Sequence, residues 1–177
     1  MIENFGAAGG SAEPCVKARE ALRNVKTPDI AIASNHWRIY SNNPQNQEDL
    51  HKKLMEQVAF FNPPPKMMIF IGSPGEVDYA CETYNKRRLK HSTKECGAVN
   101  AQIYQNYIRW TKSQNFPPFV HFIYSFLDLC NFETGQCSFE NQNNQKNYMN
   151  NDHISYAGGE KTIQKLKNLI AENDKNF

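Results

Sequence analysis

The sequence has no excess of charge of one sign and no long hydrophobic run. Lys and Arg number 20 and Asp and Glu number 18, which leaves a formal net charge of +2. This near balance gives no electrostatic reason to expect binding to nucleic acid or to an anionic membrane surface. The longest apolar run, residues 119–130, is interrupted by His121 and Asp128. It is shorter than the roughly 18 residues that a membrane-spanning helix needs.

The first six residues also lack the basic and then apolar pattern of a signal peptide. Taken alone, the sequence therefore predicts a soluble chain without a targeting segment. Its 177 residues suffice for one domain with a buried core. We expect residues 1–10, which are small and rich in glycine, to form a flexible N-terminus, and residues 11–177 to form the domain.

Short apolar runs alternate with amphipathic segments along the chain. The apolar runs predict three strands suited to burial on both faces, at residues 30–34, 66–72 and 119–124. Apolar residues at helical spacing predict one helix from Ser11 and others at residues 47–61, 98–113 and 159–173. Two polar segments, residues 73–97 and 125–152, are expected to lie outside the core.

This alternation predicts an α/β fold with a parallel sheet. Three strands form a thin sheet, so either a neighbour completes it or the beginning of the sheet is absent. Ligands of such folds bind beyond the carboxyl ends of the strands. The places to expect a site are therefore residues 34–40, residues 72–77 and the long loop that ends at His153.

The five cysteines do not fit a plain cytosolic protein. Cys130 with Cys137, and Cys81 with Cys96, are close enough in sequence to form loop-closing disulfides, which oxidising compartments favour. Cys15 would then be unpaired. Buried thiols are an alternative. Metal binding is another, although no cysteine pair has the short ligand spacing that is typical of zinc sites.

A histidine stands at the junction between a polar loop and the last helix. His153 follows the run Asn150-Asn151-Asp152 and precedes Ile154, Ser155 and two glycines. A histidine held at such a junction is placed to act on something outside the fold. The alternative is a polar loop that only caps the helix, because Asn, Asp and Ser all serve as caps.

Four segments together resemble a known family. They are residues 28–37, residues 66–74, the Cys130/Cys137 pair, and the Asp152-His153-Ile154-Ser155 run with Gly158. These resemble, over residues 28–170, the SGNH domains that are fused to membrane O-acyltransferases of acyltransferase family three. The resemblance implies a flavodoxin-like three-layer α/β fold, esterase or acyl-transfer chemistry without a cofactor, and an extracellular or lumenal location. It also implies that a multi-spanning acyltransferase domain accompanies the SGNH domain in full-length relatives.

By this resemblance, His153 is the general base of the site. The family usually has an aspartate three residues before this histidine, whereas this chain has Asn150. Replacing an orienting carboxylate by an amide costs about 10⁴ in rate in the well-studied protease triad. Asp152 is ionisable, but its position next to His153 is a poorer geometry for orienting the ring.

Residues after the first predicted strand are candidates for other parts of the site. Asn35 is a candidate oxyanion donor, although an asparagine in a loop commonly serves in a turn. His36 and Trp37 are candidates for the substrate rim, and Trp37 has core packing as its alternative role. The acceptor is expected to be a carbohydrate or a lipid-linked group.

The family's serine nucleophile lies in a Gly-Asp-Ser block, and this sequence has no such block. Ser11 follows Gly9-Gly10, but no apolar strand precedes it to form a nucleophile elbow. We expect that the N-terminal part of the family's domain is absent from this chain. Two functions remain: a catalytic acyl-ester domain, and a non-catalytic or truncated SGNH-like module.

Overall fold

The structure is a computed structural model that describes residues 26–35, 44–78, 95–99, 101–149 and 153–174. Its centre is a parallel sheet of three strands, β1 (Ile30–Asn35), β2 (Met67–Gly72) and β5 (Val120–Ile123). The strand order is β1-β2-β5. All three lie where the sequence predicts them. The expected burial on both faces is wrong for β1, which lies at the edge of the described sheet and has Ile32 42% exposed.

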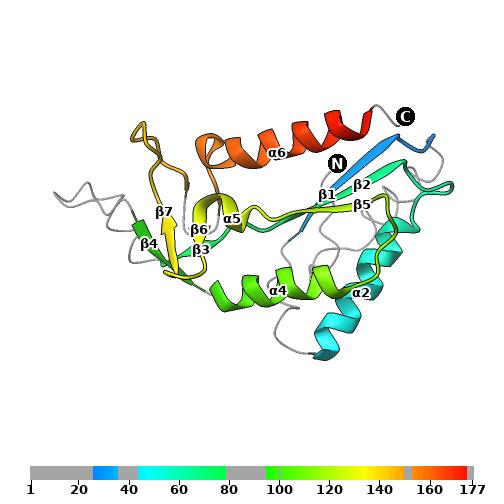
Figure 1. Ribbon diagram of the computed structural model, residues 1–177, viewed down its shortest axis with the longest axis horizontal. Helices are drawn as coiled ribbons and strands as arrows, with labels where there is room; N and C mark the ends of the chain where they lie inside the picture. Colours follow the sequence, from blue (N-terminus) through cyan, green and yellow to red (C-terminus); the bar gives the residue numbers. More distant parts are fainter. Residues whose placement is uncertain (1–25, 36–43, 79–94, 100, 150–152, 175–177) are drawn as a thin grey trace, which may run out of the picture.

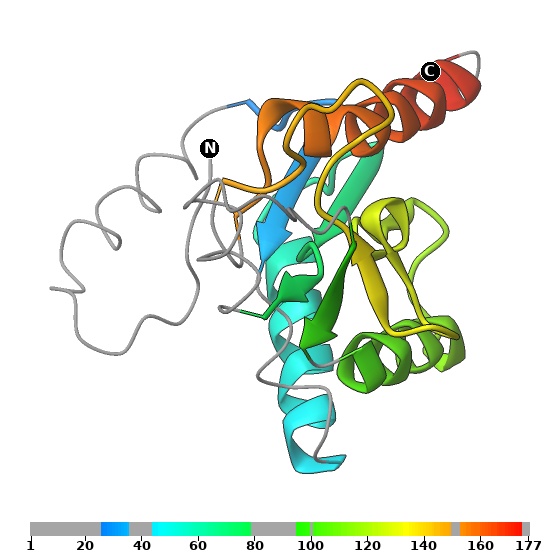
Figure 2. The ribbon, with the colours of Figure 1, turned by 90° about the vertical axis from the view of Figure 1, so that its left-hand side faces the viewer.

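Helices cover both faces of this sheet (Figures 1 and 2). On one face, α2 (Pro44–Val58) and α4 (Ala101–Ser113) pack against the sheet. On the other face lies α6 (Tyr156–Asp174). Successive strand residues point to opposite faces, so β2 sends Met68 and Phe70 toward α2 and α4 and Met67 and Ile69 toward α6. The fold is therefore the expected α/β arrangement of three layers.

The described parts of the two polar segments, residues 73–78, 95–97 and 125–149, do not lie outside the core, and for them this prediction was wrong. They supply a second, antiparallel sheet at one end of the molecule (Figure 1). Its strands, in the order β3-β4-β7-β6, are β3 (Glu76–Val77), β4 (Glu95–Val99), β7 (Gln136–Ser138) and β6 (Cys130–Asn131). The short helix α5 (Phe126–Leu129) precedes β6.

This second sheet has its own hydrophobic cluster. Val77, Cys96, Cys137 and Tyr148 are almost completely buried in it. Each segment contributes only a few apolar residues among many polar ones, so no periodicity reveals the cluster until the segments are brought together. The helix predicted at residues 98–113 begins only at Ala101, because the chain before it forms strand β4, which extends to Val99.

The last helix begins at Tyr156, three residues before the predicted start. Gly158 and Gly159 are poor helix formers, and they obscured its first turn in the sequence. Among the described residues, no helix has the length and apolar character needed to cross a membrane.

Candidate functional site

The structure describes only some of the candidate site residues. His153 is exposed and lies three residues before the first residue of α6. The backbone of Asn35 ends β1, opposite Gly72 of β2, at the carboxyl edge of the parallel sheet. Other candidates lie outside the described residues: Ser11, His36, Trp37, Asn150 and Asp152.

The loop that carries His153 is closed by backbone hydrogen bonds. Met149 N–H donates to the carbonyl of His153 at 2.8 Å, and Ser155 N–H donates to the carbonyl of Asn147 at 2.8 Å. Between these two bonds, Tyr148 and Ile154 form an antiparallel bridge. The bridge leaves only residues 150–152 to connect its two sides, so the backbone on both sides of the loop is fixed.

Strand alternation then separates the side chains of this bridge. Tyr148 is buried and Ile154 packs against the same cluster. Met149 and His153 therefore belong to the opposite face, and both are exposed, Met149 at 70%. The local fold thus directs the candidate base away from the core.

Ser155 and Gly158 explain why the loop meets the helix in this way. The Ser155 hydroxyl accepts a hydrogen bond from Gly158 N–H at 3.1 Å and donates to the carbonyl of Lys146. A Cβ on Gly158 would lie 2.1 Å from the carbonyl oxygen of Asn147, so only glycine lets the chain before the loop run this close to the helix. Both residues belong to the sequence motif that contains His153, but the motif alone does not reveal these structural roles.

A buried carboxylate fixes α6 to α5. The side chain of Asp128, 2% exposed, forms an ion pair with Lys165 and accepts a hydrogen bond from the Thr162 hydroxyl at 2.5 Å. The Lys161 ammonium donates to the backbone carbonyl of Asp128 at 3.3 Å. Together these contacts fix the end of α6 that lies nearest His153.

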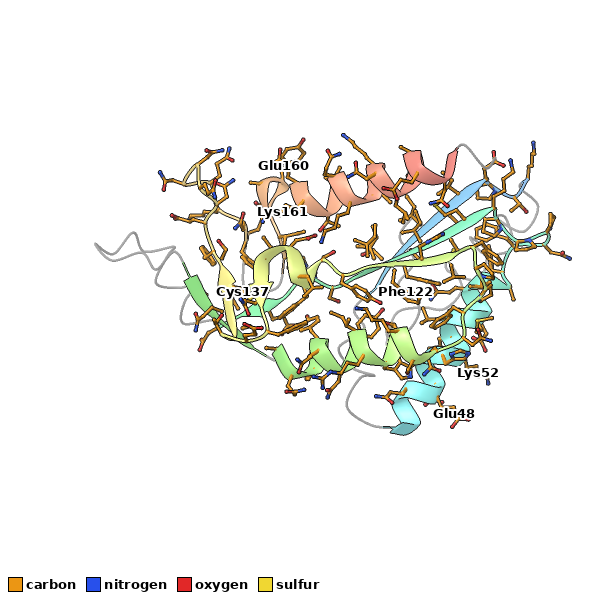
Figure 3. The ribbon with its side chains drawn as sticks, viewed as in Figure 1. Glu48, Lys52, Phe122, Cys137, Glu160 and Lys161 are labelled. Carbon is orange, nitrogen blue, oxygen red and sulfur yellow. A yellow bond between two sulfur atoms is a disulfide. The ribbon has the colours of Figure 1, made fainter. Side chains whose placement is uncertain are left out.

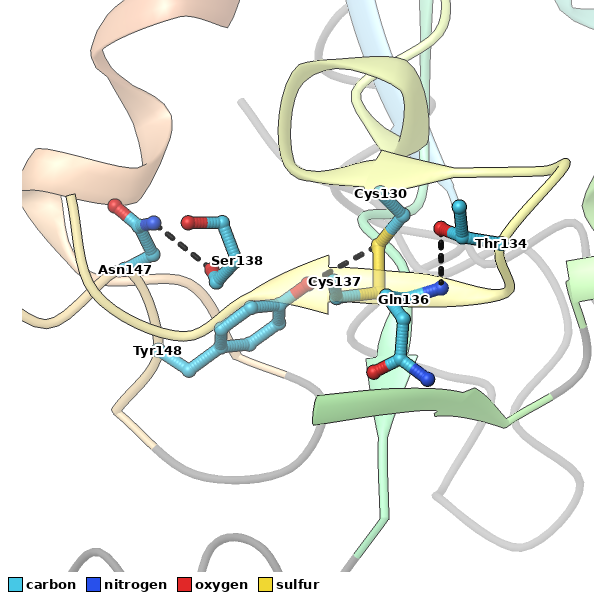
Figure 4. The surroundings of a disulfide bond; sticks show 7 residues. All are labelled: Cys130, Thr134, Gln136, Cys137, Ser138, Asn147 and Tyr148. Carbon is cyan, nitrogen blue, oxygen red and sulfur yellow. Dashed lines mark hydrogen bonds between the residues drawn. A yellow bond between two sulfur atoms is a disulfide. The ribbon is translucent and has the colours of Figure 1, made fainter. Parts of the chain in front are cut away.

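The disulfide between Cys130 and Cys137 is present, as the sequence predicts, and it links β6 to β7 (Figure 4). The Tyr148 hydroxyl lies 3.5 Å from Cys130 Sγ, and the Tyr148 ring stacks on Phe139 at 5.7 Å between centroids. Burial raises the pKa of Tyr148 well above its usual value. The disulfide thus supports the buried side of the bridge on which His153 is held.

Cys96 lies opposite Cys137 in the pairing of β4 with β7. It is also disulfide-bonded, and its partner falls outside the described residues. Cys81, its predicted partner, and Cys15 are both in that part of the chain. Within the described residues, no group of three His, Cys, Asp or Glu side chains is arranged to hold a metal ion.

Comparison with known proteins identifies the family. Residues 4–167 match the family model of the SGNH domain (fused to AT3 domains). No curated protein and no solved structure matches the chain. Proteins of this family are generally hydrolase-like or acyltransferase-like. The match spans most of the chain, and the chain belongs to the family of SGNH domains that occur fused to AT3 domains.

Proposed function

We propose that this domain acts on acyl esters, by hydrolysis or by transfer of the acyl group, with His153 as the general base. The observation that carries the proposal is the exposed His153 on a loop whose two sides are joined by backbone hydrogen bonds of 2.8 Å. A general base must be held at a fixed place and must reach the substrate. The exposure of His153 and the two backbone hydrogen bonds of its loop support this role.

In this mechanism a serine hydroxyl attacks the acyl carbonyl while His153 accepts the serine proton. The same histidine then protonates the leaving oxygen, and backbone amides or the Asn35 amide stabilise the oxyanion. Asn150 or Asp152 orients the imidazole. His36 and Trp37 contact the substrate at the rim. We assign no residue of this sequence as the nucleophilic serine.

We further propose that the acyl esters are those of a carbohydrate or of a lipid-linked acceptor. The domain would occupy residues 11–177 and would work beside a multi-spanning acyltransferase domain, since the family's SGNH domains are fused to AT3 domains. An extracellular or lumenal location is supported by the disulfide between Cys130 and Cys137, because oxidising compartments favour such bonds.

A second candidate function is a non-catalytic SGNH-like module. Two observations favour it: the sequence has no Gly-Asp-Ser block, and Asn150 stands where an orienting aspartate is expected. Such a module would retain the fold without the nucleophile.

Hydrolysis of a short-chain p-nitrophenyl ester by the purified chain distinguishes the two. A serine-reactive fluorophosphonate probe is applied in parallel. The catalytic proposal expects turnover and labelling, both lost in His153→Ala and both kept in His91→Ala, a control histidine with no proposed role. A folded chain without turnover or labelling would instead support the non-catalytic module.

A further inference from the structure

A pocket of about 540 Å³ lies between the start of α6 and the segment of residues 138–147. Its volume is in the range of small-molecule sites, roughly 300–1,000 Å³. Figure 3 shows Glu160 and Lys161 in the first turns of α6, at the end that lies nearest the second sheet. Most residues that line the pocket are polar or charged: Asp128, Ser138, Glu140, Asn141, Gln142, Asn143, Asn147, Glu160 and Lys161.

Some of these polar groups are already used by the fold. The Asn147 amide donates to the carbonyl of Ser138 at 2.8 Å, and the Ser138 hydroxyl donates to the carbonyl of Glu140 at 2.7 Å. The Lys161 ammonium donates to the carbonyl of Asp128. These bonds hold the wall of the pocket and leave other groups available to a ligand.

Four side chains remain available. In the described part of the chain, the carboxylates of Glu140 and Glu160 and the amides of Gln142 and Asn143 make no hydrogen bond or ion pair. The carboxylates only accept hydrogen bonds, whereas each amide both donates and accepts. The pocket therefore offers donors and acceptors side by side.

This mixture of groups favours one class of ligand. The charged residues at the pocket are Asp128, Glu140, Glu160 and Lys161, and Asp128 is paired with Lys165. The two uncommitted carboxylates disfavour an anionic ligand. A neutral hydroxyl-rich ligand fits, because each hydroxyl can donate to a carboxylate and accept from an amide.

We infer that this pocket binds a neutral sugar unit through Glu140, Glu160 and Gln142. The pocket is close to the candidate base. Asn147, in its wall, lies two residues before Met149, which is hydrogen-bonded to the backbone of His153, and two strand residues span about 7 Å. If the proposed acyl transfer holds, on which this assignment rests, the pocket positions the hydroxyl acceptor beside His153.

The test measures binding and needs no catalysis. Methyl β-glucoside, a neutral sugar, and glucuronate, its anionic counterpart, are titrated into the purified chain and followed by calorimetry or NMR shifts. We expect methyl β-glucoside to bind more tightly than glucuronate. Glu160→Ala and Gln142→Ala should each weaken its binding by about tenfold, the loss of one hydrogen bond to a polar or charged group.

Glu172→Ala is the matched control, because Glu172 is an exposed glutamate of the same helix outside the pocket, and it should bind as the wild type does. Circular dichroism verifies that each variant is folded. The inference is overturned if the neutral sugar does not bind, if glucuronate binds more tightly, or if both pocket variants bind like the control. Sugar binding without ester turnover would uphold the pocket and reject the catalytic proposal, whereas turnover without sugar binding would do the reverse.

Discussion

The backbone at Gly158 lies against the carbonyl of Asn147, so that an added Cβ would come within 2.1 Å of its oxygen. We predict that Gly158→Ala lowers the free energy of unfolding by about 1–3 kcal/mol, the usual cost of overpacking. Gly159→Ala is the control, since its Cβ would meet only Ile154 Cδ1 at 3.5 Å. That variant should gain about 0.5–1 kcal/mol from helix propensity. Urea unfolding measures the free energy of unfolding of both variants. If both were equally stabilised, the predicted clash at Gly158 would be wrong.

The ion pair beneath α6 gives a second prediction. Lys165→Met leaves the buried Asp128 carboxylate with Thr162 as its remaining side-chain partner, which should cost about 1–3 kcal/mol of stability. Lys167→Met, in the same helix at an exposed position, should change stability by less than about 0.5 kcal/mol. Thermal unfolding compares the stability of the two variants. Similar midpoints would show that the ion pair between Asp128 and Lys165 contributes little to stability.

Another glycine pair tests the packing around the disulfide. A Cβ on Gly75 would lie 2.2 Å from Cys130 Sγ and 3.0 Å from the Phe126 ring, whereas one on Gly97 would meet nothing within 4 Å. Gly75→Ala should therefore lose about 1–3 kcal/mol through overpacking, and Gly97→Ala should lose none. Denaturant unfolding under oxidising conditions compares them. The packing argument fails if Gly75→Ala is as stable as Gly97→Ala.

Removal of the disulfide itself should also weaken the fold. The bond joins residues seven apart in sequence, and a loop this short corresponds to about 2–3 kcal/mol in the chain-entropy treatment. The double variant Cys130→Ser with Cys137→Ser should unfold at a lower temperature by a matching amount. A reducing agent should lower the midpoint of the wild type further than that of the variant. An unchanged midpoint in the variant would contradict the prediction.

His121 predicts a dependence of stability on pH. Partial burial lowers the pKa of His121 below its usual value of 6.5. The unfolded chain then binds the proton more readily, so this contribution to stability is complete above pH 6.5 and is lost as the pH falls through the lowered pKa. Between about pH 7.5 and about pH 5, the wild type should lose more stability than His121→Gln. Urea midpoints at the two pH values measure this, and parallel losses would refute it.

The local pattern of the sequence determined the parallel sheet and the helices that cover it. The apolar run of β2 is almost wholly buried, and such burial leaves a continuous signal in the sequence. The run of β1 is also apolar, although its Ile32 is 42% exposed. The pair Cys130 and Cys137 was also readable, because the two residues lie close together in the chain.

Only the tertiary structure decided the second sheet and the surroundings of His153. The second sheet is built from segments that are far apart in sequence, such as β3, β4 and β7, and each segment alone is too short and too polar to indicate a core. Tertiary contacts also explain Gly158 and Asp128. Position 158 requires glycine because the carbonyl of Asn147 lies against it, and Asp128 accepts a hydrogen bond from Thr162, 34 residues away in the sequence. Contacts of this kind have no periodicity, because they depend on how separate elements pack and not on the conformation of any one of them.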